Sequence, residues 1–337
     1  MSERNAKVSR RMSISCAVSV VIPVYNSATT LPRAVESALQ QDLQDLELLI
    51  VDDGSTDATN QVAKSYTADA RVRVMSLVNN RGKAHAMNVA IAEATGEWIA
   101  VLDADDWYAP DRLSTLLRAG ERNNVQLVAD NQLLYDEGVD QVLRTAFPDA
   151  LGERRLDKQS FAAGCDPYAN FDLGMLKPVV RADFVRRTGV AYRENARLSE
   201  DFLYLLEFLA AGGEGVVIPR PLYYWRQAFG TVSRRWTGTA GGEWRYDFLS
   251  GVRANAEVLT AMRDRGEDAL ARLLVRRMRA FRQLHQLQEV SRRRATGATP
   301  VQLVASILRH PSIWPLVAQR GMRRIARRKE SNSPIRA

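Results

Sequence analysis

Three aspartates crowd together where an apolar stretch of the chain ends. Residues 99–102 are apolar or small and lead directly into Asp103, Asp105 and Asp106. Carboxylates this close raise one another's pKa values, so a cation is expected among them. One aspartate would be enough to begin a turn. Because Mg²⁺ binds through one or two carboxylates plus substrate phosphates, and Mn²⁺ also prefers oxygen ligands, we interpret the cluster as a metal–phosphate site.

Other polar groups also stand where apolar stretches end or begin. Asp52 and Asp53 open the turn DDGSTD, and Glu200 and Asp201 open an apolar stretch. Lys83 follows a glycine, where a basic side chain can meet an anion at a helix start. Each has an ordinary alternative: a turn, a solvated loop charge, or an acidic pair favoured by the helix dipole. If the acidic pair Glu200 and Asp201 is functional, it would supply a general base directed at the cleft that the other polar groups line.

The first hundred residues predict strands that alternate with helices. Strands are expected over 18–25, 46–51, 72–78 and 98–102, and the helix before the last strand is expected to end at Gly96. This alternation indicates an α/β fold with a mostly parallel sheet. Ligands of such sheets bind beyond the carboxyl ends of the strands. Asp52 and Asp53, and the aspartates at 103–106, follow two of the predicted strands and are expected there.

The second part of the chain is less regular. A helix is predicted over 110–123, a strand over 125–130, a helix over 200–212, and two strands over 216–219 and 223–226. From about residue 241 the sequence is mainly helical and rich in arginine. We expect an N-terminal extension over 1–16, a main domain over 17–235 divided at 107/108, and a helical C-terminal region over 236–337.

The cysteine count and the lengths of the apolar stretches exclude several classes of protein. The 337 residues include only two cysteines, which excludes a disulfide scaffold and a cysteine-rich zinc site. No apolar stretch reaches the length of a membrane-spanning helix. The basic and apolar N-terminus lacks a convincing cleavage site and leads into a strand, so we do not interpret it as a signal peptide.

Charge is distributed unevenly along the chain. Residues 251–337 hold 19 Lys and Arg against 6 Asp and Glu, whereas residues 1–250 hold 28 against 33. Residues 301–329 also mix arginines with apolar side chains and include Trp314, as in a segment that lies on anionic lipid. The alternatives are a helical subdomain with a solvated basic face, and a nucleic-acid partner. No nucleic-acid motif is present, so no such partner is expected.

Several motifs, taken together, resemble one known family. They are VSVVIPVYN (18–26), LLIVDDGSTD (48–57), NNRGKAHAMN (79–88), WIAVLDADD (98–106) and LSED (198–201). In this order and spacing they resemble the family 2 glycosyltransferases of the GT-A fold, of the type that builds bacterial exopolysaccharides and surface glycans. The chain departs from many members at Met87, and it lacks the Gln-x-x-Arg-Trp signature of processive synthases.

The resemblance implies roles for individual residues. It implies a donor nucleotide site at Pro23, Tyr25, Asn26, Asp52, Asp53, Lys83, Asp103 and Ala104. It implies metal binding, of Mn²⁺ or Mg²⁺, by Asp105 and Asp103, and a catalytic base at Asp201 beside Glu200. It also implies contact with the acceptor or the diphosphate by Asp106, Trp107, Trp225 and Arg226.

The resemblance also implies an activity. We expect an inverting transfer of a sugar, glucose in our prediction, from a UDP-sugar to a saccharide or lipid-linked acceptor. We expect a cytoplasmic enzyme held on the inner face of the cytoplasmic membrane by its C-terminal region. The alternatives are a nucleotidyltransferase, which would also use carboxylates at strand ends, and a nucleic-acid-binding protein that uses the basic tail.

Overall fold

The first part of the chain folds as alternating strands and helices. The computed structural model describes residues 16–148, 152–169, 171–196, 198–227 and 247–318. The order is β1 (Cys16–Val24), α1 (Leu31–Leu39), β2 (Leu46–Asp52), α2 (Thr59–Ser65), η1 (Tyr66–Ala68), β3 (Val72–Ser76), α3 (Lys83–Glu93) and β4 (Gly96–Val101). The four predicted strands are therefore present. Helix α3 ends before Gly96, and this glycine begins β4 instead of ending the helix.

The middle of the chain completes the sheet. It contains β5 (Trp107–Tyr108), α4 (Arg112–Asn123), β6 (Leu127–Asp136), β7 (Gln141–Thr145), β8 (Arg154–Leu156), α5 (Lys158–Gly164), η3 (Leu173–Met175), β9 (Val179–Arg181), α6 (Ala182–Thr188), α7 (Glu200–Ala210) and β10 (Gly215–Gln227). The two strands predicted at 216–219 and 223–226 are one strand, β10. Its pairing with β6 shifts register near Pro221, because proline cannot donate a ladder hydrogen bond.

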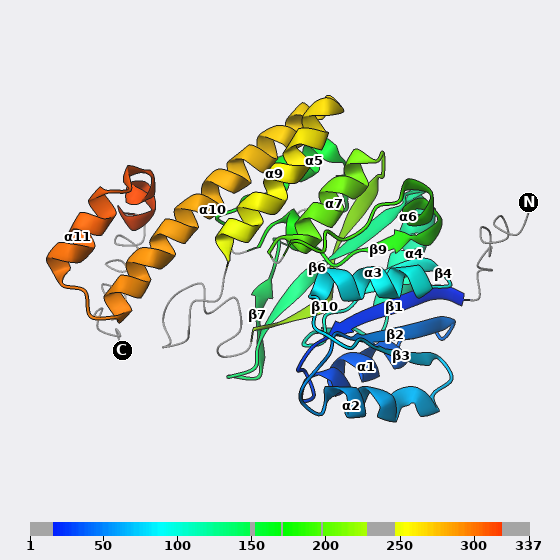
Figure 1. Cartoon of the computed structure of the whole chain (residues 1–337). Coiled ribbons are helices and arrows are strands. Elements are labelled where there is room, and N and C mark those ends of the chain that lie inside the picture. Colours follow the sequence, from blue (N-terminus) through cyan, green and yellow to red (C-terminus); the bar gives the residue numbers. More distant parts are fainter. Residues whose placement is uncertain (1–15, 149–151, 170, 197, 228–246, 319–337) are drawn as a thin grey trace, which may run out of the picture.

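The strands form one mixed sheet. Its order is β3-β2-β1-β4-β9-β6-β10-β5, with β7 beside β6 and β8 beside β10. Strands β3, β2, β1 and β4 are mutually parallel, and β9 joins β4 to β6 with antiparallel pairing. The predicted α/β fold with a mostly parallel GT-A-like sheet and additional C-terminal helices is confirmed (Figure 1).

Each central strand is buried on both faces, which explains why its sequence is almost continuously apolar. Val21 and Leu49 lie in the core that includes α3 and α7, whereas Val20 and Leu48 lie in the core that includes α1 and α4. Alternate residues of one strand therefore hold helices on opposite sides of the sheet. The strand ends beyond these cores are thus held rigidly.

Three helices follow residue 246 among the described residues. They are α9 (Phe248–Asp264), α10 (Asp268–Ala295) and α11 (Pro300–Leu308), followed by the short turn η4 (Pro311–Ile313). Figure 1 shows α9 and α10 side by side, next to α5 and α7. Val258, Leu270 and Leu274 belong to the same core as α7. Within the described part of the chain no helix combines the length and apolar character needed to cross a bilayer.

Two predicted regions extend beyond the described residues. The N-terminal extension lies outside them except for Cys16, and the C-terminal region is described only over 247–318. The helical character predicted for that region holds over α9, α10 and α11.

Candidate functional site

The parallel strands bring the predicted residues to one edge of the sheet. In the registers of these strands, Val24 at the end of β1 pairs with Asp52 of β2, and Val21 pairs with Val101 at the end of β4. The segments that follow these strands therefore leave the sheet at the same edge. They carry Tyr25 and Asn26, then Asp53, and then the aspartate cluster.

Two lysines join two of the predicted carboxylates into one cluster. The Lys83 Nζ lies 2.8 Å from Asp103 Oδ1 and 3.0 Å from Asp201 Oδ2. The Lys177 Nζ lies 2.7 Å from Asp103 Oδ2 and 2.6 Å from the same Asp201 Oδ2. Two positive and two negative groups thus meet in a mostly buried site. The structure brings together residues from α3, the end of β4, the segment before β9, and the start of α7.

The charges in this cluster set the protonation of its carboxylates. Burial opposes the charged form of Asp201, but Lys177 and then Lys83 outweigh burial and lower the pKa of this carboxyl below its usual value. The pKa of Asp103 is lowered by the same two lysines against burial. Both groups are therefore ionised at neutral pH. Burial, with the charge of Asp201, raises the pKa of the neighbouring Glu200.

One oxygen of Asp201 is left without a hydrogen-bond partner. Both lysines contact Oδ2, whereas Oδ1 is buried and accepts no hydrogen bond among the described residues. A buried carboxylate oxygen without a donor is costly. An acceptor hydroxyl that donated to Oδ1 would remove this cost and would stand in the right place to lose its proton.

Lys177 was not among the residues predicted from the sequence. It lies between η3 and β9, and its side chain is 10% exposed. The only local signal is a single lysine within the apolar stretch LGMLKPVV. Buried lysines are rare unless they are paired, so the lysine within an apolar stretch was a usable but weak indication.

The loop after β1 and the loop after β2 hold each other. Asn26 has a positive φ of 47°, and its Oδ1 accepts from the backbone N–H of Thr56 at 2.8 Å. Its own N–H donates to Ser55 Oγ. Tyr25 is 44% exposed, and Pro23 is buried at the end of β1. The predicted donor residues of these two loops are therefore neighbours, with Tyr25 on the surface.

The two adjacent aspartates at the end of β2 have different partners. Asp52 accepts from the backbone N–H of Ser55 at 3.0 Å and from Asn60 Nδ2 at 2.7 Å. Asp53 accepts from the backbone N–H groups of Arg81 and Gly82, at 2.9 and 2.6 Å. Asp53 thereby fixes the loop that leads into α3 and its first residue, Lys83. Both residues are only 2% exposed, and the hydrogen bonds named here leave lone pairs on each carboxylate.

The third aspartate of the cluster, Asp106, supports the site from behind. It is buried and accepts from the Tyr223 hydroxyl at 2.6 Å and from the backbone N–H of Arg226 at 2.8 Å. The Tyr223 hydroxyl in turn accepts from the backbone N–H of Asp103 at 3.2 Å. Burial, then the charges of Asp105 and Asp103, raise the pKa of Asp106 well above its usual value.

The candidates for contact with the acceptor or the diphosphate lie around Asp106. Trp107 is buried, its ring stacks on Tyr224, and the Arg33 guanidinium lies 3.3 Å from its centroid. Ala104, which was predicted for the donor site, is also buried. Arg226 forms an ion pair with Glu137. The Trp225 ring lies 5.7 Å from that of Phe171. Of these candidates, Arg226 is joined to the site directly, through its backbone hydrogen bond to Asp106.

Asp105 is the carboxylate best suited to a divalent metal. Burial and the charge of Asp103 raise its pKa, and neither lysine of the cluster lies within ion-pair distance of it. Both oxygens of Asp103 are paired with lysines. Within the described ranges no three His, Cys, Asp or Glu side chains are grouped as a metal centre. The donor set therefore fits one carboxylate ligand, with the remaining positions supplied by phosphate and water.

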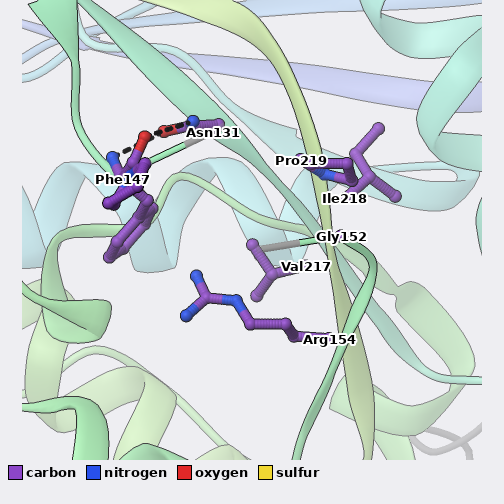
Figure 2. A pocket seen from close by; sticks show the side chains of 8 residues that line it. Asn131, Phe147, Gly152, Arg154, Val217, Ile218 and Pro219 are labelled. Atoms are coloured by element: carbon purple, nitrogen blue, oxygen red, sulfur yellow. Dashed lines mark hydrogen bonds between the residues drawn. The ribbon is translucent and has the colours of Figure 1, made fainter. Parts of the chain in front are cut away.

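A separate hollow lies away from this cluster. Figure 2 shows side chains that line it, including Asn131, Phe147 and Arg154. None of the carboxylates or lysines described above lines it. We therefore assign the chemistry to the strand-end cluster and not to this hollow.

Comparison with known proteins identifies relatives along almost the whole chain. Residues 19–172 match the family model described as "Glycosyl transferase family 2". The succinoglycan biosynthesis protein ExoO of Rhizobium meliloti is 33% identical over 321 residues, which cover 92% of this chain and 87% of that protein. ExoU of the same organism is 33% identical over 213 residues, which cover 60% of this chain and 59% of ExoU.

Solved structures support the fold. The chain superposes on S. aureus TarS 1-349 in complex with UDP with a TM-score of 0.53 at 17% identity, covering 82% of this chain and 87% of that one. The corresponding complex with UDP-GlcNAc gives a TM-score of 0.54 at 17% identity. At this identity the likeness establishes the shared fold.

Proposed function

Because the chain belongs to the family 2 glycosyltransferases, we propose that it transfers a sugar from a UDP-sugar to a saccharide or lipid-linked acceptor during exopolysaccharide synthesis. Glycosyltransferase activity follows from the family. The observation that carries the finer proposal is the pairing of Asp201 with Lys83 and Lys177, close in sequence to Asp105, which forms no ion pair with another described residue. The names of ExoO and ExoU support the exopolysaccharide context, and the UDP complexes of TarS support the donor.

The proposed donor site lies at the carboxyl ends of β1, β2 and β4. Tyr25 and Asn26 would pack against the nucleoside, and Asp52 and Asp53 would accept its hydrogen bonds. Lys83 lies at the first residue of α3, where an ammonium group and the helix N-terminus both favour a diphosphate. The three strand ends thus supply a surface, hydrogen-bond acceptors and positive charge.

A divalent metal, Mn²⁺ or Mg²⁺, is proposed to bind Asp105 together with the donor diphosphate. When bound, it would supply Lewis-acid stabilisation of the departing nucleoside diphosphate. The residues of this chain have two further roles there. Lys83 and Lys177 place positive charge beside Asp103, and Asp106 fixes the backbone of Asp103 through Tyr223.

Asp201 is proposed as the general base. It is ionised because its two lysines outweigh burial and lower its pKa, and Oδ1 is free to accept the proton of the acceptor hydroxyl. A positioned base of this kind contributes about 10²–10⁴-fold to the rate. One carboxylate acting in one displacement inverts the anomeric configuration, so an α-linked donor would give a β-linked product.

A thermal-shift panel tests the donor proposal. The panel compares UDP, GDP, UDP-glucose and UDP-N-acetylglucosamine, each with Mn²⁺ or with EDTA, because a ligand of the folded state raises Tm. We expect UDP compounds to raise Tm in the presence of Mn²⁺, with UDP-glucose as the sugar donor. Asp105→Asn should lose the Mn²⁺-dependent part of the shift, and Asp183→Asn, which changes an exposed aspartate of α6, is the control. Equal shifts with GDP and UDP would contradict a UDP-specific site.

We further propose that the enzyme works on the inner face of the cytoplasmic membrane. Helix α11 presents Val301, Val304 and Leu308 at helical spacing, and all three are more than half exposed. Trp314 follows at 46% exposed, and arginines 292–294 are exposed at the end of α10. An apolar helix face beside arginines complements a bilayer that carries anionic lipid.

Vesicle sedimentation tests this location. The wild type should sediment with phosphatidylglycerol-containing vesicles and much less with phosphatidylcholine alone. Val304→Glu together with Leu308→Glu should abolish sedimentation, whereas Val142→Glu, which changes an exposed valine on β7, should not. Sedimentation that is unchanged in the α11 double variant would contradict the proposal.

A further inference from the structure

Arg277 belongs to the C-terminal helix α10, yet it is buried against the segment that carries the proposed base. Its side chain is 8% exposed, in a helix whose other arginines are mostly on the surface. Taking a guanidinium group out of water is unfavourable unless its donors are paired. Its Nε is buried without a hydrogen-bond partner among the described residues, so the contacts of Nη1, Nη2 and the guanidinium plane indicate what its burial achieves.

Arg277 contacts two segments that are distant in sequence. Its Nη1 lies 3.1 Å from Asp172 Oδ2, and its Nη2 donates to Ser199 Oγ at 3.4 Å. Its guanidinium carbon lies 3.7 Å from the centroid of the Phe202 ring. One planar cation thus meets a carboxylate, a hydroxyl and an aromatic face, which an arginine can do and an ammonium group matches only in part.

Each of these partners adjoins a residue of the site. Asp172 immediately precedes η3 and caps it, because its Oδ1 accepts from the backbone N–H of Gly174 at 2.8 Å, and the chain then continues to Lys177. Ser199 and Phe202 flank Glu200 and Asp201, and Ser199 has a φ of 76°. The two segments that meet at Arg277 are therefore the ones whose side chains, Lys177 and Asp201, pair at 2.6 Å.

We propose that Arg277 is a positioning residue that holds the Lys177 segment against the start of α7, so that Lys177 and the base Asp201 keep their pairing. This inference rests on the proposed role of Asp201. It makes α10 part of the framework of the site and not only a basic surface helix. A displacement of about 1 Å in a catalytic group can cost about 10²-fold in rate, so loss of this contact should affect turnover.

Loss of Arg277 should affect turnover and donor binding differently. Among the described residues, Arg277 contacts Asp172, Ser199, Phe202 and Phe281, and none of these lies at the ends of β1 and β2 or in the loops that follow them. Removing Arg277 should therefore lower kcat much more than it weakens donor binding. A residue that only stabilised the fold would lower the amount of active enzyme and leave the remaining molecules unchanged.

The experiment compares Arg277→Met, Arg277→Lys and the control Arg272→Met, which changes an exposed arginine of the same helix. For each full-length variant, kcat and the donor KM are measured by UDP release with a membrane acceptor extract, normalised to folded protein. We expect Arg277→Met to lower kcat at least about 10-fold, with donor KM within about 3-fold. Arg277→Lys should recover part of kcat, and Arg272→Met should match the wild type.

Two outcomes would overturn the proposal: a normal kcat per folded molecule in Arg277→Met, or an equal loss of kcat and of donor affinity. If Arg277→Met does not fold, Asp172→Asn replaces it. That variant keeps an oxygen for the Gly174 N–H but removes the charge that pairs with Arg277. The same loss of kcat with a nearly unchanged donor KM is expected. Asp201→Asn in the same assay separates the positioning role of Arg277 from the base role of Asp201, because a fully active Asp201→Asn would contradict the base role.

Discussion

Replacing Lys177 by methionine is the perturbation that most directly probes the charge balance of the site. The wild-type ammonium group is shared between Asp103 and Asp201, at 2.7 and 2.6 Å. Methionine has a similar length and no charge, so Asp103 and Asp201 would share Lys83 alone. Lys177→Arg is the matched control because it retains the positive charge.

The magnitude follows from burial. Removing one partner of a buried ion pair costs about 3–5 kcal/mol, and the low end applies here because Lys83 remains and the four side chains are 10–26% exposed. A loss of about 3 kcal/mol lowers Tm by roughly 6–12 °C for a domain of this kind. Thermal unfolding with and without UDP measures this change.

The pH dependence of kcat is a second property in which Lys177→Met should differ from the wild type. Against burial, Lys177 is the strongest contributor that lowers the pKa of Asp201, so the variant should have a higher pKa at this carboxyl. A base that must be ionised then loses activity at a higher pH, and the acidic limb of the kcat profile moves upward. An unchanged Tm together with an unchanged acidic limb would refute the reasoning.

Three further predictions follow from the same contacts. Arg112→Met would leave Asp130 buried without its cation, and urea unfolding should show a loss of about 3–5 kcal/mol. Asp106→Asn should retain kcat within about tenfold, which corresponds to less than about 1.4 kcal/mol in activation free energy, because an amide oxygen can still accept from the backbone N–H of Arg226. Steady-state kinetics measures this. Gly120→Ala would bring a Cβ to 2.5 Å from the Trp98 ring, and thermal unfolding should show a cost of about 1–3 kcal/mol.

Prediction from the sequence was most accurate where charged residues stand at the end of an apolar strand or at the start of a helix. Strands such as 18–25 were predictable because burial on both faces demands continuous apolar residues, and parallel topology then placed the aspartates of different strands at one edge. Lys83 and Asp201 lie 118 positions apart, yet both were predicted, each from its place at the start of a helix.

Other features depend on packing that no local pattern encodes. Lys177 lies in an apolar stretch whose only unusual member is the lysine, and its partners come from the end of β4 and from α7. The single strand β10 was divided in the prediction because Pro219 and Pro221 interrupt its middle, and its pairing with β6 continues past them with shifted register. Arg277 was indistinguishable by sequence from the exposed arginines around it.

The central claim is that Asp201 removes the acceptor proton while the strand-end site binds the donor. The most direct test is kcat of Asp201→Asn for UDP release in the presence of acceptor, with UDP affinity measured on the same preparation. We expect a loss of about 10²–10⁴-fold in kcat with UDP affinity nearly unchanged. A kcat within a few-fold of the wild type would contradict it.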